Sequence, residues 1–358
     1  MNAPSVRLAK IERRAGRVRI NRRKVKIAAV LPILPIAAFL FSLTVGRYGI
    51  PLPEFFRLLR MRALGIALEG NFSTMATVLF GVRLPRILSA LLVGAALSAS
   101  GATYQGIFKN PMVSPDILGA SAGAGFGAAL AILNSFGILG IELSSFLGGI
   151  TAVFMTSLFT RAVGRHGETV LLLILTGMVV QNLFSAFTSI TKYVADPNDK
   201  LPEITFWLMG GLSSITWREV WMLLIPCMAG MIPLFLSRWQ INALTFGDEE
   251  AQSLGVDTRK IRILLIFAST LLTSASIAVS GMIGWVGLII PHLTRLAVGP
   301  NYRALLPASV LIGSAFLLLV DNAARCIFPT EIPLGILTSI IGAPFFLYLL
   351  LKRKGAAE

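Results

Sequence analysis

The sequence predicts an all-α fold: a polytopic membrane protein with about ten transmembrane helices. Hydrophobic residues make up 55% of the 358 residues, the mean hydropathy is +0.77, and charged residues account for only 14%, against about 25% in soluble domains. So much apolar surface cannot be buried in one globular core. A bilayer span needs about 20 apolar residues, so ten spans fit within this length and leave room for connections.

Ten apolar segments follow one another along the chain. They occupy 27–45, 84–104, 115–134, 143–161, 169–191, 219–238, 263–281, 283–298, 305–323 and 333–351. We therefore expect a transmembrane domain over 27–351. A basic cytoplasmic tail of residues 1–26 precedes it, and a cytoplasmic tail of residues 352–358 follows it.

Two connections between these spans have a readable pattern. In the long connection 46–83, residues 51–60 predict a short amphipathic helix lying at the membrane face. Residues 196–203 predict a polar, turn-rich loop, and 206–211 an apolar helix that two glycines interrupt. Both connections are expected on the outer side of the membrane.

The basic residues predict the orientation. Segments assigned to the cytoplasmic side carry 22 of the 32 Lys and Arg residues, ten of them within residues 7–26. This bias follows the positive-inside rule and places both termini in the cytoplasm, with the N-terminal tail near anionic lipid headgroups. Nucleic acid is not an expected partner, because the cations lie between apolar spans. Six of the ten outer cations fall within residues 47–86, and the rule does not explain them.

Several functional classes are disfavoured by what the spans contain. Acids in and beside the spans lie near predicted span ends, among them Asp116, Glu168, Asp321 and Glu331. An ion-coupled secondary carrier, which usually needs a carboxylate within the membrane, is therefore only a remote alternative. The histidines are His166 and His292, without a HExxH motif, and no P-loop sequence occurs. We expect no catalytic, metal or cofactor site and, with two isolated cysteines, no disulfide.

Small residues recur at helical spacing in three places. These are Gly94, Ser98 and Gly101; Gly119, Gly123 and Gly127; and Gly281, Gly284 and Gly287. In lipid, such stripes allow close helix packing. They predict a compact bundle and carry no functional information by themselves.

Arginines mark the outer ends of two spans. Arg83-Leu-Pro-Arg86 places two guanidiniums around Pro85 at a predicted helix start, where proline needs no N–H partner. Asp321 and Arg325 are spaced i,i+4, which predicts either a local salt bridge or an outer surface that Arg325 shares with Arg83 and Arg86. Guanidiniums pair with carboxylates, so such a surface suits an acidic soluble partner.

The cytoplasmic connection 239–262 is the second informative region. Three acids beginning at Asp248 predict a helix N-terminus, Gly255 predicts the end of that helix, and residues 256–262 begin another. Two short helices between spans are compatible with a solvated connection. We favour a docking surface for a cytoplasmic partner.

Ordered motifs extend these observations over nearly the whole chain after residue 27. They are Arg83-Leu-Pro-Arg86, Gly101-x-x-x-Gln105, Asn110-Pro111, Pro115, Leu118-Gly119, Leu254-Gly255, Gly287-Leu-Ile-Ile-Pro-His292, Asp321-x-x-x-Arg325, Ile332-Pro-x-Gly335 and Gly342-x-Pro344. In this order they resemble the FecCD family, the permease subunits of type II binding-protein-dependent ABC importers for vitamin B12, haem and ferric siderophores.

The resemblance implies the type II ABC importer permease fold, a homodimer and a translocation path on its two-fold axis, lined by the fifth span. It implies a bacterial or archaeal cell membrane. Two cytoplasmic ATPase subunits, which would bind ATP and Mg, dock on the 248–262 helices, and a substrate-binding protein docks outside. The resemblance also implies that this chain itself binds no cofactor and is not an enzyme.

The resemblance also assigns roles to residues. Binding-protein docking falls to Arg83, Arg86 and Arg325. ATPase coupling falls to Asp248, Glu249, Glu250, Ala251, Leu254 and Gly255. The inner gate falls to Gly167, Glu168 and Thr169, where Glu168 departs from the small polar residue expected there.

The substrate that we favour is a ferric siderophore or a similar metal chelate. Residues 201–210 and 284–287 also resemble a subgroup that contains a molybdate/tungstate permease. Haem, cobalamin and molybdate or tungstate therefore stay open as alternatives, because selectivity in this class resides mostly in the binding protein.

Overall fold

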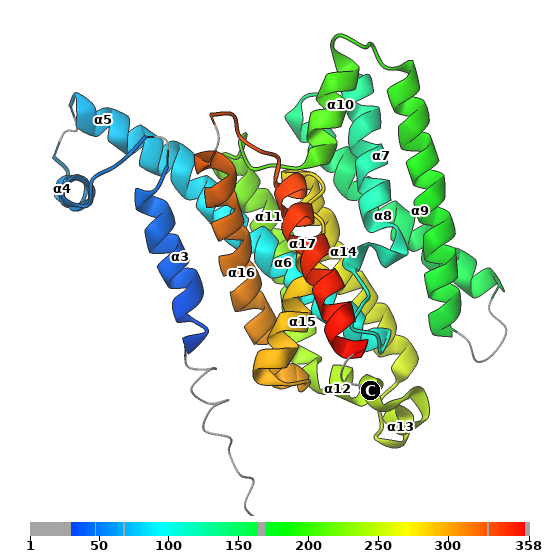
Figure 1. Ribbon diagram of the computed structural model, residues 1–358. Coiled ribbons are helices and arrows are strands. Elements are labelled where there is room, and N and C mark those ends of the chain that lie inside the picture. The colour runs from blue at the N-terminus through cyan, green and yellow to red at the C-terminus, as the bar shows by residue number, and fades with distance from the viewer. Residues whose placement is uncertain (1–29, 47, 67–68, 164–168, 328, 355–358) are drawn as a thin grey trace, which may run out of the picture.

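The computed structural model describes residues 30–46, 48–66, 69–163, 169–327 and 329–354, and these residues form helices without a β-strand (Figure 1). The elements are α3 Ile33–Thr44, α4 Leu52–Ala63, α5 Asn71–Ala76, η1 Thr77–Arg83, α6 Leu84–Ile107, η2 Pro115–Leu118, α7 Ala120–Leu133, α8 Ile138–Val163, α9 Thr169–Val194, α10 Lys200–Met209, α11 Trp217–Leu236, α12 Arg238–Phe246, α13 Asp248–Ser253, α14 Thr258–Ser280, α15 Val286–Val298, α16 Tyr302–Cys326 and α17 Leu334–Lys354.

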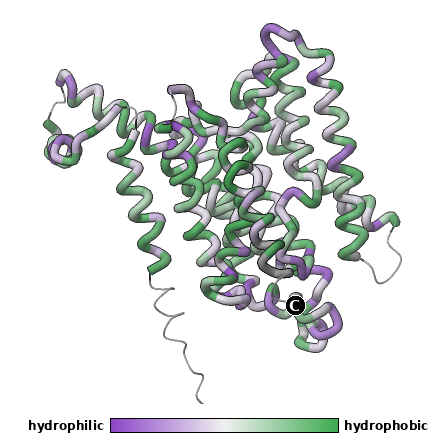
Figure 2. The backbone as a smooth tube through the Cα atoms, in the orientation of Figure 1, coloured by the Kyte–Doolittle hydropathy of each residue, from purple (hydrophilic) through white to green (hydrophobic). Residues whose placement is uncertain are grey.

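The ten predicted spans each correspond to a helix. Within the described residues, six helical segments are long and apolar enough to cross a membrane, and four shorter apolar helices accompany them. The bundle has two ends in Figure 1: an upper end that carries α10 and the end of α16, and a lower end that carries α12 and α13. The described chain begins and finishes at the lower end. Figure 2 shows hydrophobic residues along the bundle and hydrophilic residues gathered at its two ends.

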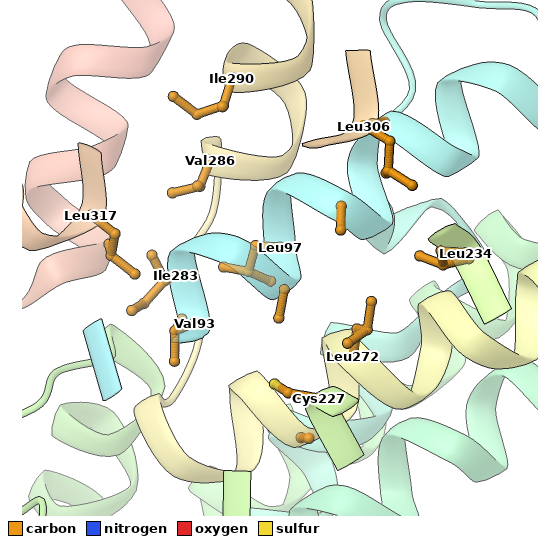
Figure 3. Packing of buried hydrophobic residues seen from close by; sticks show 14 of the residues in the cluster. Val93, Leu97, Cys227, Leu234, Leu272, Ile283, Val286, Ile290, Leu306 and Leu317 are labelled. Carbon is orange, nitrogen blue, oxygen red and sulfur yellow. The ribbon is translucent and has the colours of Figure 1, made fainter. Parts of the chain in front are cut away.

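Helix α6 lies at the centre of the bundle, and most of its residues are buried. It packs against α11, α14, α15 and α16. Figure 3 shows Val93 and Leu97 of α6 among apolar side chains of these helices and Ile283 of the connection between α14 and α15. The largest cluster of buried apolar side chains therefore joins helices that are far apart in the sequence.

Members of all three predicted small-residue stripes make close helix contacts, among them Gly127, on which a Cβ atom would lie 2.1 Å from the Ser144 carbonyl oxygen of α8. A Cβ atom on Gly101 would lie 1.8 Å from the Gly287 carbonyl oxygen, and one on Gly94 would lie 2.2 Å from that of Gly313. The backbones of α6, α15 and α16 therefore touch, as predicted.

Two stripes are wrong in part. Gly119 precedes α7 with a φ of +85° and joins that helix to η2. Gly281 and Gly284 lie in the connection between α14 and α15, so only Gly287 of that stripe belongs to a helix.

The predicted helix start at Arg83 is wrong. Residues Asn71–Ile107 form one continuous helical run, with the π-helix η1 immediately before α6. A proline ring collides with the carbonyl four residues earlier in a regular α-helix. The wider turns of η1 lie at that position relative to Pro85, so the helix continues through the proline.

Three other boundaries differ from the predictions. Lys200–Glu203, expected in a loop, are the first turn of α10, because the Asp196 carboxylate accepts the backbone N–H of Asn198 at 2.7 Å and arranges the chain for a helix. The predicted second short helix over 256–262 is the beginning of the long α14, and the short pair consists of α12 and α13. The predicted tail 352–358 begins within α17.

Candidate functional site

Three arginines meet at the upper end of the bundle beside the end of α3. Arg83 ends η1, Arg86 lies in the first turn of α6, and Arg325 lies in the last turn of α16. Only 4%, 7% and 6% of their surfaces are exposed, respectively. The sequence analysis offered a shared outer surface of these three arginines as one alternative. The structure does place them close together, but they are buried beneath the surface. We refer to them as the buried arginine group.

Arg86 is held by two carboxylates of different exposure. Its Nε and Nη2 atoms donate to Asp321 at 2.8–3.1 Å, and its Nη1 donates to both Glu331 oxygens at 2.9 and 3.0 Å. The Asp321 side chain is completely buried, whereas 34% of the Glu331 side chain is exposed. Glu331 belongs to the connection between α16 and α17, so this connection covers the Arg86 guanidinium on its outer side.

Arg325 and Arg83 are bound to the end of α3. Arg325 Nη2 donates to the Ser42 hydroxyl at 2.6 Å and also to the Asn322 side-chain oxygen. Its Nε lies 3.7 Å from Asp321, so the predicted i,i+4 ion pair forms and Asp321 is shared with Arg86. Arg83 donates to the carbonyls of Leu43 and Tyr48 at 2.6 and 2.7 Å. These bonds satisfy buried charges that would otherwise be costly.

The residues predicted for ATPase coupling lie on α13 and the turn after it, at the lower end. Asp248 accepts two hydrogen bonds from Arg262 of α14, at 2.9 and 3.0 Å, and Ala251 is buried. These two residues therefore attach α13 to the bundle. Glu249, Glu250, Leu254 and Gly255 are exposed. Gly255 has a φ of +82° and ends the helix as predicted.

An apolar surface accompanies these exposed residues. Phe246, which precedes α13 in the sequence, is 74% exposed, and Leu254, which follows α13, is 56% exposed. A groove of about 270 Å³ begins at Gly255, the residue after Leu254, with Trp239 and Leu264 in its lining. At its rim, the Asp257 carboxylate accepts the Lys260 backbone N–H, and this bond lowers the pKa of Asp257. Large exposed apolar side chains at a polar end of a membrane protein are typical of an interface.

Helix α9 carries a polar stripe that sequence analysis did not single out. One face packs on α7, α8 and η2 through buried Leu173, Val180 and Phe184. Another face exposes the polar residues Gln181, Asn182, Ser185 and Ser189. The i, i+4, i+8 spacing of positions 181, 185 and 189 within an apolar span was the available signal.

The predicted inner gate is described only at its last residue. Gly167 and Glu168 lie outside the described residues, and Thr169 is the first residue of α9. Sequence analysis also missed Glu331 and Ser42 as partners of the arginines. No local pattern marks them, since they lie 245 and 283 positions from Arg86 and Arg325, respectively.

The chain matches known proteins over almost its entire length. The model of the FecCD transport family matches residues 33–352. The molybdate import system permease protein MolB of Haemophilus influenzae is 41% identical over 335 residues, covering 93% of this chain and 98% of that protein. A permease of Helicobacter pylori named for iron chelatin transport is 41% identical over 285 residues, covering 80% of this chain and 86% of that protein.

A solved structure has the same fold. It is described as a metal-chelate type ABC transporter in an inward-facing conformation. It is 40% identical in sequence and superposes with a TM-score of 0.82, covering 91% of this chain and 99% of the other.

Proposed function

The chain belongs to the FecCD transport family and is a multi-pass permease subunit of an ABC importer, and from this premise we propose its complete assembly and cargo. Two copies pair in the cell (inner) membrane, two cytoplasmic ATP-binding subunits dock at the lower end, and an extracytoplasmic binding protein docks at the upper end. The complex moves a ferric siderophore or similar metal chelate into the cytoplasm. Both termini are cytoplasmic, and ATP and Mg bind to the partner ATPases.

The polar stripe of α9 is the main support for a translocation path between two copies of the chain. Gln181, Asn182, Ser185 and Ser189 are exposed on a helix that is the least buried of the six long apolar segments. Facing lipid, amide groups would lose hydrogen bonds with water. A water-filled path between this face and a second copy keeps them hydrated. This supports the fifth span as the lining of the path.

The lower end supports docking of the ATPase subunits. Phe246 and Leu254 are exposed, and the groove of about 270 Å³ begins at Gly255, the residue after Leu254. A partner that filled this groove and covered the adjoining turn would remove Leu254 from water. Asp248 and Arg262 join α13 to α14, so a displacement of α13 would reach a helix that crosses the whole bundle. This connection supplies a route from ATP-driven closure to the membrane domain.

The upper end supports docking by carboxylate exchange. Arg86 is the arginine with a replaceable partner, since Glu331 is one-third exposed while Asp321 is completely buried. An acidic residue of the binding protein could take the place of Glu331 without leaving a guanidinium unpaired. Docking would then release the connection between α16 and α17, and Asp321 would keep Arg86 in position.

The substrate proposal has support from two sides. The iron chelatin permease and the metal-chelate type structure favour a ferric chelate. The relative named MolB is similar over a larger share of both chains, and this favours molybdate as the second candidate. Haem and cobalamin remain alternatives because the resemblance of the motifs extends to their permeases.

The deciding experiment is uptake by cells that lack this gene, compared with cells in which it is restored. Labelled ferric siderophores, haem, cobalamin and molybdate are offered in parallel. Gene-dependent uptake of an iron chelate alone supports the first candidate, and uptake of molybdate alone replaces it with the second. In proteoliposomes, transport by this subunit without its ATPase partners, driven by an ion gradient, would overturn the importer assembly in favour of a secondary carrier.

A further inference from the structure

The unexplained cations of the upper end include three exposed arginines on α4. Arg57, Arg60 and Arg62 are all exposed, and none belongs to the ion pairs found among the described residues. The Arg57 guanidinium lies 5.5 Å from the centre of the Phe72 ring and that of Arg62 lies 3.9 Å from the centre of the Phe80 ring. Aromatic rings therefore hold two of the charges in position without neutralising them.

The same helix exposes an apolar stripe. Leu52, Phe56 and Leu59, at spacing i, i+4, i+7, are 57%, 62% and 38% exposed. Phe55 and Leu58, at 9% and 0%, attach the helix to its neighbours from another side. Helix α4 therefore has one face against the protein, one apolar face that the described part of the chain leaves exposed, and arginines beside it.

The direction of α4 matches a helix that lies in a membrane surface. In Figure 1, α4 is seen along its axis, whereas α3 and α16 run between the lower and the upper end of the bundle. The helix is therefore steeply inclined to the helices that cross the membrane. It also lies at the edge of the bundle, near the upper end of α3. A helix in this position lies where the acyl chains give way to the headgroups.

We propose that α4 binds anionic phospholipid headgroups in the leaflet at the upper end of the bundle. Leu52, Phe56 and Leu59 enter the upper part of the acyl layer, and Arg57, Arg60 and Arg62 lie at the level of the phosphates. This division of apolar and basic residues is that of an interfacial helix. An acidic soluble protein fits less well, because it would leave the apolar stripe in water or require a matching apolar surface.

The proposal accounts for arginines that run against the charge bias of the chain. The positive-inside rule concerns orientation during insertion, whereas each basic residue at an anionic surface adds about a fivefold preference for that surface. Three such residues on a 12-residue helix therefore give a strong local selection for anionic lipid. The assignment of inside and outside does not affect this inference, because both leaflets can carry such lipids.

The test uses the full chain with a nitroxide attached to Leu59→Cys. Cys326→Ser removes the exposed native cysteine, and Cys227 is 1% exposed and stays unlabelled. Nanodiscs of phosphatidylcholine are compared with nanodiscs that also contain phosphatidylglycerol. Relaxation by oxygen and by a water-soluble nickel chelate reports whether the label lies in lipid or in water.

We expect a label shielded from the nickel chelate, and more strongly shielded as phosphatidylglycerol is added. Arg60→Gln, which removes the arginine without a ring contact, should raise the phosphatidylglycerol content needed for half of this effect about fivefold. The triple Gln variant of Arg57, Arg60 and Arg62 should abolish the dependence. Lys192→Gln, at the upper end of α9, is the matched control and should change nothing.

Each contrary outcome rejects a defined part of the proposal. A label equally open to the nickel chelate in both nanodiscs overturns the membrane position of α4. Shielding that is independent of phosphatidylglycerol overturns the role of the arginines. Shielding that appears only after the binding protein is added makes α4 a protein-docking surface and rejects lipid as its partner.

Discussion

The two arginine groups at the upper end differ in what surrounds their charges. The buried group of Arg83, Arg86 and Arg325 is at most 7% exposed, and carboxylates, a hydroxyl and backbone carbonyls hold its members. The group on α4 is exposed and contacts aromatic rings. The α4 group and two members of the buried group come from the same 46–86 stretch of sequence, so their difference arises only in the folded chain.

The comparison separates stability from recognition. A buried charge that loses its partner is expensive, since desolvation is no longer offset. An exposed arginine contributes little to folding, so a group of three needs a binding role to account for it. We therefore expect substitutions in the buried group to change the free energy of unfolding, and substitutions on α4 to change membrane association.

Asp321→Asn should produce the largest effect. Asp321 has no exposed surface and is shared by Arg86 and Arg325. The neutral amide keeps the shape and leaves two buried guanidiniums with less compensation, which should cost about 3–5 kcal/mol of unfolding free energy. Thermal unfolding in detergent micelles measures this. A loss no larger than that of Arg60→Gln would mean that burial does not distinguish the two groups.

Ser42→Ala should have the second largest effect. The hydroxyl accepts a hydrogen bond from Arg325 and donates one to Asn322 at 2.8 Å. Its removal leaves a buried donor with fewer acceptors and should cost about 1–3 kcal/mol. The exposed Ser185→Ala on α9 serves as the control in the same unfolding assay. Equal stability of the two variants would contradict the view that α3 is fastened through Arg325.

Glu331→Gln sharpens the comparison within the buried group. Because Glu331 is one-third exposed, its pair with Arg86 should contribute about 1 kcal/mol or less to stability. If a partner carboxylate replaces Glu331, the weaker competitor should raise the affinity for the binding protein up to about fivefold. Titration of the binding protein onto nanodiscs measures this.

The alternatives for Glu331 have separate signatures. Reduced affinity would mean that Glu331 positions Arg86 for docking and is not displaced. Arg86→Gln tests docking itself, provided that its unfolding profile shows a folded protein. The simultaneous reversal of all three arginines to Glu is uninformative, because three buried carboxylates facing Asp321 would prevent folding.

Sequence alone predicted the fold well, because each span carries its own signal. Apolar length identified ten helices, and small residues identified the contacts of Gly94 and Gly101. Predictions from the local sequence were wrong where neighbouring residues determine the backbone conformation. The turn before Pro85 widened to π geometry and continued the helix, and the Asp196 side chain extended α10 into a predicted loop.

The candidate site was predicted in position but not in environment. The motifs placed Arg83, Arg86 and Arg325 together, and the i,i+4 spacing found Asp321. Glu331 and Ser42 could not be predicted, since contact between distant helices has no local pattern. Burial of the arginines follows from these partners, and so it was missed for the same reason.

Phe80→Leu should give a small effect on stability, similar to that of Glu331→Gln, and the sharpest comparison. Phe80 supplies the ring beneath Arg62 at 3.9 Å, and leucine keeps most of the apolar volume. Loss of this contact should cost about 0.5–1 kcal/mol, well below Asp321→Asn, because water can solvate the released guanidinium. The label at position 59 should at the same time become more mobile, as α4 loses one of its contacts. A loss of stability equal to that of Asp321→Asn would instead make α4 part of the structural core, and the division into buried and binding arginines would fail.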